Sequence, residues 1–441
     1  TLFPYTTLFR SGAWSELANW RTEALPAMNE LVFVTNAGSS VTCAVDPTFR
    51  SLWTWCMDAT KTNTVTFTGD WTADDANQKF MVVGSNTCVR FENARVKVNR
   101  IATVWTNYAG TVQAAYPRYW CVGNLFENYQ DYFVPGKNAR LEFVGSTISI
   151  SNAISANAHI GHRATLLFDD TTMDAMKKFA FYVYDNGTAT LTNHSTLVAD
   201  EGGGAIGLAT GSRLFVHDSV ITNRANGASP LSYYGNPTNV IVRVTGASHI
   251  YCKDQFATAT SSSLTGANVA SAGEITIADS SRLTANHFGF TVPAGGTMAV
   301  NVIDEASLSA SYPFFMGRDG AGALDFNVDT TGKVRLEFIG ANNSTNANSR
   351  VRVTIDNGQV TTTTSNKDCP GVAFGYGSGA SLPQSRGELV MNGGTLNASI
   401  AGGVSDHQWF GFMLGRMDGY LGYNGVGTNY TGPSSYAPHA M

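Results

Sequence analysis

The chain has 441 residues, of which only 14% are charged, and its formal net charge at neutral pH is −5. Typical soluble domains carry about 25% charged residues, and a weakly acidic chain lacks the basic surface that nucleic-acid binding requires. No run of eighteen apolar residues occurs, so we expect no membrane-spanning segment. β-Branched and aromatic residues are common while Lys and Glu are scarce, which predicts a β-rich fold.

The N-terminal part divides into two segments before the repeats begin. Residues 1–11 read TLFPYTTLFRS, which looks like translated sequencing adapter, so we expect them to be an artefact. Residues 12–59 contain Trp14 and Trp20 and are predicted to form a Trp-rich cap with the first strands. A single solenoid domain is predicted from residue 60 to residue 441. We expect this sequence to be a fragment, truncated at the C-terminal end.

The strongest pattern is an internal repeat of about 25 residues. Each repeat begins with a strand in which apolar and polar residues alternate. A short polar turn follows, and then a further apolar residue. These further residues are Trp71, Val96, Ile148, Met173, Leu197, Ile221, Ile250, Leu283, Leu308, Val334, Val360 and Leu396. Most neighbouring members of this series are about 25 residues apart, but Val96 and Ile148 are separated by 52 residues. This doubled spacing predicts one more coil near Val122. Such a period is typical of a solenoid of parallel strands, here with thirteen or so coils.

Two other all-β folds also produce short strands. An antiparallel sandwich has strands at similar spacing, but the repeat is self-similar and tight Asn-Gly turns are few. A β-propeller needs blades of about 40–50 residues, which exceeds the period. The one helix-prone stretch runs from Met173 to Phe181, and we expect a short helix decorating a loop there.

Catalysis in such a fold would require side chains from neighbouring coils to converge. Glycoside hydrolysis needs two carboxylates about 5 Å or about 6.5–9.5 Å apart. The best candidates are Asp169 and Asp170, preceded by His159, His162 and Arg163, and the later pair His217 and Asp218. However, Asp170 and Asp218 occupy the turn position that holds Gly145, Asn193, Gly246 and Asp279 in other repeats. A turn favours Asp for conformational reasons, so we assign no catalytic residue.

No cofactor or metal is predicted. Nucleotide-binding and nucleophile motifs are absent in a strand-to-helix context. Acidic residues such as Asp304, Glu305, Asp319 and Asp325 are dispersed rather than clustered as a calcium site requires. We therefore expect a protein that is not an enzyme. A carbohydrate-active β-helix enzyme, either a polysaccharide lyase or a glycoside hydrolase, stays open as the alternative.

Cysteines and aromatic residues have competing interpretations. The six cysteines, which include no C-x-x-C pair, are predicted to be buried thiols that pack as small apolar groups. A disulfide among the first four is the alternative. The aromatic pairs at 233–234 and 409–410, with Tyr420 and Tyr423, fit inward stacking or a sugar-binding surface. The cysteines are Cys43, Cys56, Cys88, Cys121, Cys252 and Cys369.

Two local patterns resemble repetitive bacterial surface proteins. Trp14-Ser15, then Ala18-Asn19-Trp20 and Pro26 before an apolar strand, are similar to the start of many such chains. Residues 387–396, GELVMNGGTL, look like the core of autotransporter-associated β-strand repeats. The resemblance implies a right-handed, single-stranded parallel β-helix in an autotransporter passenger region. It also implies an extracellular or outer cell-surface location and a non-catalytic structural or adhesive stalk. Its partners would be host or environmental glycans or other surface proteins.

Overall fold

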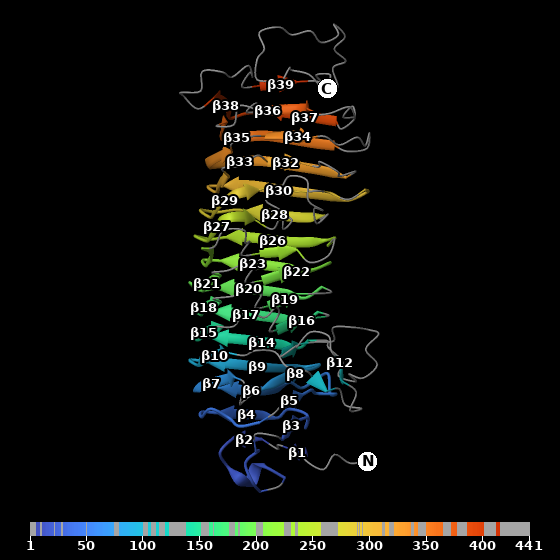
Figure 1. Ribbon diagram of the computed structural model, residues 1–441, viewed down its shortest axis with the longest axis vertical. Coiled ribbons are helices and arrows are strands. Elements are labelled where there is room, and N and C mark those ends of the chain that lie inside the picture. Colours follow the sequence, from blue (N-terminus) through green and yellow to red (C-terminus); the bar gives the residue numbers. More distant parts are fainter. Residues whose placement is uncertain are drawn as a thin grey trace. The chain divides into compact units, whose positions relative to one another are not determined.

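The computed structural model shows two compact units, Thr1–Ser232 and Tyr233–Met441, and each is a β-solenoid of stacked parallel strands (Figure 1). The predicted fold class is therefore confirmed. A 3-10 helix, η1 (Leu17–Asn19), is the only helical element among the described residues. The structure describes residues 6–8, 11–21, 23–27, 30–49, 51–74, 79–99, 105–106, 112–113, 120–122, 138–150, 158–161, 163–175, 181–183, 186–199, 206–224, 231–233, 237–256, 272–288, 290, 292, 294–310, 314–316, 322–336, 339–342, 350–364, 372–376, 386–400 and 412–414.

The first unit consists of three columns of parallel strands, and most coils contribute one strand to each column. The first two coils contribute no described strand to the second column. The first column contains β2 (Gly12–Ala13), β4 (Ser40–Cys43), β6 (Asn63–Phe67), β9 (Thr87–Glu92), β14 (Arg140–Val144), β17 (Thr165–Asp169), β20 (Thr188–Thr192) and β23 (Arg213–His217). The second contains β7 (Asp70–Asp74), β10 (Arg95–Asn99), β15 (Thr147–Ile150), β18 (Thr172–Ala175), β21 (Thr196–Ala199) and β24 (Val220–Asn223). The third contains β1 (Thr6–Leu8), β3 (Leu31–Val34), β5 (Ser51–Thr54), β8 (Phe80–Val83), β13 (Trp120–Val122), β16 (Ala158–Ile160), β19 (Phe181–Val183) and β22 (Ile206–Leu208), and β25 (Leu231–Tyr233) lies at the unit boundary.

The second unit repeats the same arrangement. Its first column contains β26 (Val240–Thr245), β28 (Gly273–Ile277), β30 (Thr297–Asp304) and β37 (Arg386–Met391), and its second contains β27 (His249–Phe256), β29 (Arg282–Phe288), β31 (Ser307–Ala310) and β38 (Thr395–Ile400). The long strands β33 (Ala323–Leu336) and β35 (Arg350–Thr364) run through both columns. A third column contains β32 (Phe314–Met316), β34 (Ile339–Asn342), β36 (Val372–Tyr376) and β39 (Phe412–Leu414).

The register confirms the repeat that the sequence predicts. In the first unit Trp71 pairs with Val96, and Ile148 pairs with Met173 on the next coil. In the second unit Leu283 pairs with Leu308. Alternate residues of each strand point inward, so equivalent apolar side chains stack on one another and form the core.

The expected extra coil near Val122 is wrong. Val96 pairs directly with Ile148, so this double-length step is one coil with a long insertion. Two strands of the insertion, β11 (Trp105–Thr106) and β12 (Val112–Gln113), pair antiparallel. Val122 belongs to β13, a third-column strand between β8 and β16. An insertion between strands of one coil leaves the stacking intact because each strand pairs only with its equivalents.

The expected helix at residues 173–181 is also wrong where the structure describes it. Thr172–Ala175 and Phe181–Val183 are strands. Met173 is fully buried between Ile148 and Leu197 of the neighbouring coils. Packing on these neighbours outweighs local helix propensity, as it commonly does for short segments. Residues 176–180 lie outside the described part of the chain.

Buried aromatic side chains fill the start of the first unit. Trp14 and Trp20 meet edge to face with ring centroids 4.7 Å apart, and Trp20 Nε1 donates a hydrogen bond of 2.8 Å to the Trp14 carbonyl. Parallel pairing already begins in this segment, with β2 on β4 and β1 on β3. Strand β1 lies within residues 1–11, whose adapter origin stays a prediction.

A column of phenylalanines continues the core through the first unit. Phe67, Phe91, Phe143 and Phe168 occupy the same inward position of successive coils and are at most 1% exposed. Their rings stack with centroids 5.1 Å, 5.1 Å and 5.4 Å apart. Offset stacking of this kind adds about 0.5–1.5 kcal/mol per pair beyond the burial of apolar area.

Candidate functional site

The acidic pair Asp169 and Asp170 lies where β17 ends and the coil turns its first corner. Asp169 Oδ1 accepts a hydrogen bond of 2.7 Å from Asn193 Nδ2 of the next coil. Asp170 has a φ of 48°, and its amide donates to the Thr192 carbonyl at 3.2 Å. Asp tolerates this left-handed conformation better than most residues. One carboxylate therefore links two coils, and the other belongs to the residue that turns the chain.

His217 and Asp218 lie at the same corner two coils later. Asp218 has a φ of 45°, its carbonyl accepts a hydrogen bond from the His194 amide at 2.8 Å, and its Oδ2 lies 3.2 Å from His217 Nε2. Through the register, Asp169 and His217 are separated by the whole coil that contains Thr192, about 10 Å at the usual strand spacing. The two pairs share a corner column but do not meet on adjacent coils.

The turn interpretation of this corner is supported by the backbone of equivalent positions. Gly145 and Asn193 in the first unit have φ values of 57° and 52°. Gly246 and Asp279 in the second unit have φ values of 69° and 54°. Arg163 lies at the other corner, before β17, with a φ of 56°. The structure describes neither His162 nor the side chain of His159.

A column of buried hydroxyl groups beside this corner was missed by sequence reasoning. Ser146, Thr171 and Ser195 follow the turning residue in successive coils and are at most 2% exposed. Thr171 Oγ1 lies 3.0 Å from the carbonyl oxygens of both Phe143 and Asp169. The Ser146 amide donates to Thr171 Oγ1 at 3.4 Å, and the Thr171 amide donates to Ser195 Oγ at 3.1 Å. A recurring Ser or Thr after each turn residue is the signal that could have revealed this column.

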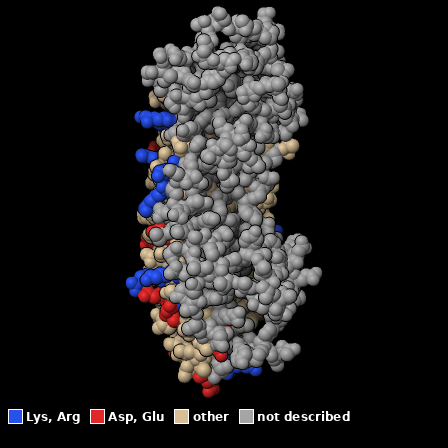
Figure 2. Space-filling view, in the orientation of Figure 1, with Lys and Arg blue, Asp and Glu red and all other residues tan. Residues whose placement is uncertain are grey.

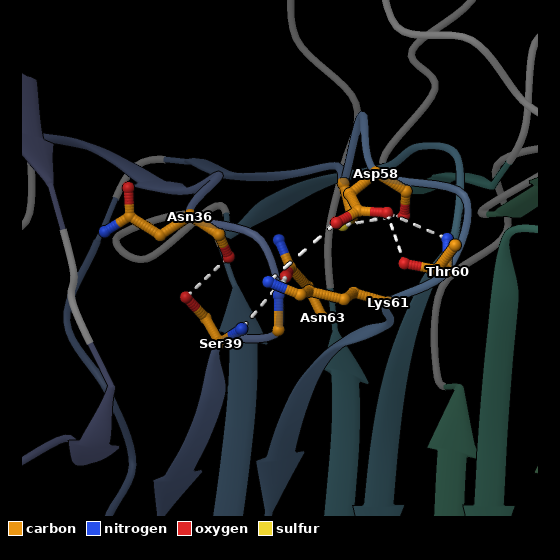
Figure 3. Close-up of polar contacts among 8 residues, drawn as sticks. Asn36, Ser39, Asp58, Thr60, Lys61 and Asn63 are labelled. Atoms are coloured by element: carbon orange, nitrogen blue, oxygen red, sulfur yellow. Dashed lines mark hydrogen bonds and ion pairs between the residues drawn. The ribbon is translucent and has the colours of Figure 1, made fainter.

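A second buried polar group closes the opposite corner of an early coil (Figure 3). Asn63 is fully buried, and its Oδ1 accepts hydrogen bonds from the amides of Gly38 and Ser39 at 2.9 Å and 3.0 Å. Its Nδ2 donates to the carbonyls of Val34 and Trp55 at 3.2 Å and 2.9 Å. This side chain uses its full hydrogen-bonding capacity on the backbone. It stabilises the fold and leaves no polar atom for a ligand.

The neighbouring acidic residue in Figure 3, Asp58, forms a local turn. Its Oδ1 accepts hydrogen bonds from the amide and hydroxyl of Thr60 at 2.9 Å and 2.6 Å, and these bonds lower the pKa of Asp58. Lys61 Nζ lies 3.8 Å from its other oxygen. A carboxylate satisfied within three residues of itself is typical of an Asx turn.

Among the described carboxylates of the first unit, the most enclosed is Glu142, which lies in the middle of β14 and is only 5% exposed. Arg90 donates two hydrogen bonds to Glu142 Oε2, from Nε at 2.9 Å and from Nη2 at 2.6 Å. Arg140 Nη1 lies 3.4 Å from Glu142 Oε1. Two guanidinium groups therefore neutralise one buried carboxylate, which is how a buried charge is tolerated in a fold. The arrangement is a complete ion cluster rather than an acid and base held ready for proton transfer.

Arginines on the first-column face of the second unit are likewise paired across strands. Arg350 Nη2 contacts both carboxylate oxygens of Asp325 at 2.6 Å and 2.9 Å. Arg243 lies 3.9 Å from Glu274. Arg352 Nε lies 3.3 Å from Glu388 without hydrogen-bond geometry. Each pair joins consecutive strands of the column, so these charges serve the stacking of the coils.

Four cations on the second-column face of the second unit have no described carboxylate as a cross-strand partner. We call Lys253, Arg282, Lys333 and Arg335 the basic strip; they are exposed on strands β27, β29 and β33. None forms an ion pair with a carboxylate of the residues that the structure describes. Figure 2 shows Lys and Arg side chains along the left edge of the upper half of the view, where these strands lie. The basic strip is the candidate functional site of the described surface.

The described cysteines are buried free thiols, as predicted. Cys43, Cys56, Cys88 and Cys252 are free and at most 2% exposed, so no disulfide joins the first three. Burial raises the pKa of Cys43 to about 11, and burial with the nearby Glu142 charge raises the pKa of Cys88 to about 12. Thiols of this kind are protonated at neutral pH and therefore unreactive. The side chain of Cys121 and all of Cys369 lie outside the described residues.

No group of three His, Cys, Asp or Glu side chains suited to a metal ion occurs within the described residues. In the same part of the chain, no helix is long and apolar enough to span a membrane. The aromatic side chains at 233–234, 409–410, 420 and 423 and the carboxylate of Asp319 lie outside the description, so the sugar-stacking surface stays a prediction.

Comparison with known proteins assigns no family. No protein-family model matches the chain, and no curated protein and no solved structure matches it. The resemblance to autotransporter-associated repeats therefore depends on the residues quoted in the sequence analysis. The described geometry is the basis for proposing a function.

Proposed function

We propose that the chain is a non-catalytic structural and adhesive β-helix module of a bacterial secreted or surface protein. One observation carries this proposal. The described acidic residues that suggested catalysis lie at a corner of the coil, where Asp169 binds Asn193 of the next coil and Asp170 and Asp218 adopt left-handed turns. The presence of acidic residues at this corner is accounted for by their role in turning the chain and in joining neighbouring coils.

The surface of the coil is suited to adhesion because it is stiff and repetitive. Each strand pairs with its equivalents on both neighbouring coils, so outward side chains are held at regular intervals of about 4.8 Å. Binding groups held on such a scaffold lose little conformational entropy when a partner binds. An extracellular location is what the resemblance to autotransporter-associated repeats implies.

The proposal is tested by incubating the purified full chain with a panel of polyuronides and neutral glycans. We expect no new reducing ends and no unsaturated products, while beads coated with the chain adhere to at least one glycan surface. Antibodies raised against the chain should label intact source cells or their culture medium.

Turnover would contradict the proposal and support the carbohydrate-active alternative. The variants Asp169→Asn and Asp218→Asn then identify the origin of that turnover. If it arises at the corner, it disappears in these variants while their circular dichroism spectra match that of the parent chain. Antibody labelling confined to the interior of the source cells would contradict the extracellular role.

A further inference from the structure

The outward face of the second column in the second unit bears cations and hydroxyl groups but no described carboxylate. Its outward positions run from β27 through β29, β31, β33 and β35 to β38. Besides the basic strip, they hold His249, Tyr251, Thr284, Asn286, Ser307, Ser309, Gln359, Thr361, Thr363, Thr395, Asn397 and Ser399. The adjacent first-column face carries Arg residues too, but each of those described above has a carboxylate from the next strand. Among the described strand residues of the second unit, the first-column arginines named above thus have cross-strand carboxylates, whereas the cations of this face have none.

Among the described side chains, the acidic residues nearest this face lie at the corner that precedes it. There Asp279 Oδ2 accepts a hydrogen bond of 2.7 Å from the Gly246 amide, and Asp304 Oδ2 accepts one of 3.3 Å from the Asp279 amide. These two carboxylates are engaged with the backbone, while Glu305 is exposed beside them. The cations of the basic strip therefore project from the strands themselves, and none forms an ion pair with a described carboxylate.

The spacing of the strip suits an extended polymer rather than a single small anion. Arg282 pairs in register with Ser307, and the Ser307 hydroxyl accepts a hydrogen bond from the Lys333 amide at 3.3 Å. Arg282 and Lys333 are thus two strands apart, about 10 Å, with a rung of serines between them. Cations separated by hydroxyl groups are complementary to a chain whose anionic groups are separated by hydroxyl-bearing segments.

The N-terminal end of this face offers an aromatic contact as well. Tyr251 is 38% exposed, and its ring meets that of His249 edge to face at 6.2 Å. Burial and, to a lesser extent, the charge of Arg282 lower the pKa of His249. An exposed aromatic ring beside polar groups is a common platform for a sugar ring because its face is apolar and its edge is polar.

We propose that the basic strip, with the hydroxyl groups between its cations, binds an acidic polysaccharide that runs across the stacked strands from one coil to the next. This inference rests on the proposed adhesive function and names its partner class. Duplex DNA fits less well, because it presents one charge per about 1.7 Å of axis and four spaced cations neutralise few of them. An anionic membrane fits less well because the described face carries no apolar side chain to insert, apart from Tyr251.

The test measures binding of the full chain to immobilised polygalacturonate, dextran sulfate and neutral dextran at several salt concentrations. We expect binding to one or both acidic polymers, no binding to neutral dextran, and an affinity that falls as salt screens the charges. Comparison of polygalacturonate with dextran sulfate distinguishes carboxylate from sulfate as the recognised group. Duplex DNA and phosphatidylserine vesicles are measured in parallel.

Matched variants locate the binding site. The double variant Arg282→Gln and Arg335→Gln removes two strip cations, and Arg243→Gln with Arg352→Gln removes two paired arginines from the adjacent face. We expect the first to weaken binding about tenfold and the second to leave it within about twofold, because exposed charges each contribute modestly. Replacing all four strip cations by Gln should abolish binding.

The results that contradict the inference differ from the result that contradicts the proposed function. Equal loss in both double variants, binding that ignores the strip variants, or no binding to either acidic polymer overturns the inference while leaving the adhesive function intact. Stronger binding to DNA or to vesicles than to both polysaccharides also overturns it. Cleavage of a bound polymer would instead overturn the non-catalytic function. Circular dichroism of every variant confirms that the coil is folded.

Discussion

Removing one ring from the phenylalanine column tests whether stacked inward side chains stabilise the coil. Phe168 is fully buried, and its ring stacks on Phe143 at 5.4 Å and meets Phe181 edge to face at 5.3 Å. The variant Phe168→Ala removes both contacts and leaves a cavity between two coils. Leu167→Ala, on the outer face of the same strand, is the matched control.

The expected loss can be estimated from the contacts. Truncation of a fully buried Phe to Ala lowers the free energy of unfolding by about 3–5 kcal/mol. Because Phe168 also loses two ring pairs, we expect a loss of about 5 kcal/mol. Phe168→Leu keeps most of the volume but loses both ring pairs, so we expect about 1–3 kcal/mol. Truncation of the half-buried Leu167 to Ala should lower the free energy of unfolding by about 1 kcal/mol, because much of the Leu167 side chain already contacts water.

Urea unfolding monitored by circular dichroism provides the comparison. Stacked repeats can unfold in parts, so the unfolding of this region is best followed by hydrogen exchange at the amides of β17 and β20. We expect protection there to fall in the order wild type, Leu167→Ala, Phe168→Leu and Phe168→Ala. An equal loss for the two alanine variants would refute the idea that the inward column dominates stability.

Three further predictions concern buried polar groups and thiols. Asn63→Ala should lower the free energy of unfolding by about 3 kcal/mol, because four backbone groups lose their partner; a loss below about 1 kcal/mol in urea melts would contradict this. Thr171→Val should cost about 1–2 kcal/mol in the same assay, whereas the exposed neighbour change Thr172→Val should cost almost nothing. The raised pKa values of Cys43 and Cys88 mean that both thiols stay protonated in the fold but ionise on unfolding near pH 9. Stability should therefore decline from pH 9 towards pH 11 by roughly 3 kcal/mol for Cys43, and this component should be missing from the pH dependence of Cys43→Ala.

The fold was largely predictable because solenoid stacking makes one inward position recur in every coil. Met173 and Leu197 were placed in register from spacing alone, and the structure pairs them. The same logic failed at Val122, because spacing cannot distinguish a missing coil from an insertion within one coil. Local propensity failed at Met173, where burial between neighbouring coils decides the conformation.

The candidate site was less predictable because it depends on which outward charges lack partners. Arg282 and Arg350 look alike in the sequence, yet only Arg350 faces a carboxylate, that of Asp325. That difference depends on the register between strands about 25 residues apart. The turn role of Asp170 could be inferred because its equivalents in other repeats are Gly and Asn. The hydrogen bonds of Thr171 required the geometry of the corner.

Direct stacking of β10 on β15 across the long insertion is tested by an engineered disulfide. Lys97 and Ser149 are exposed register partners, which places their Cα atoms about 4.8 Å apart and within the range that a disulfide spans. Mild oxidation of the variant Lys97→Cys with Ser149→Cys, followed by peptide mass mapping, should give this disulfide in high yield. Lys97→Cys with Asp174→Cys, two coils apart, should give none. A free pair at positions 97 and 149 would contradict direct stacking, since an intervening coil would separate these residues by about 10 Å.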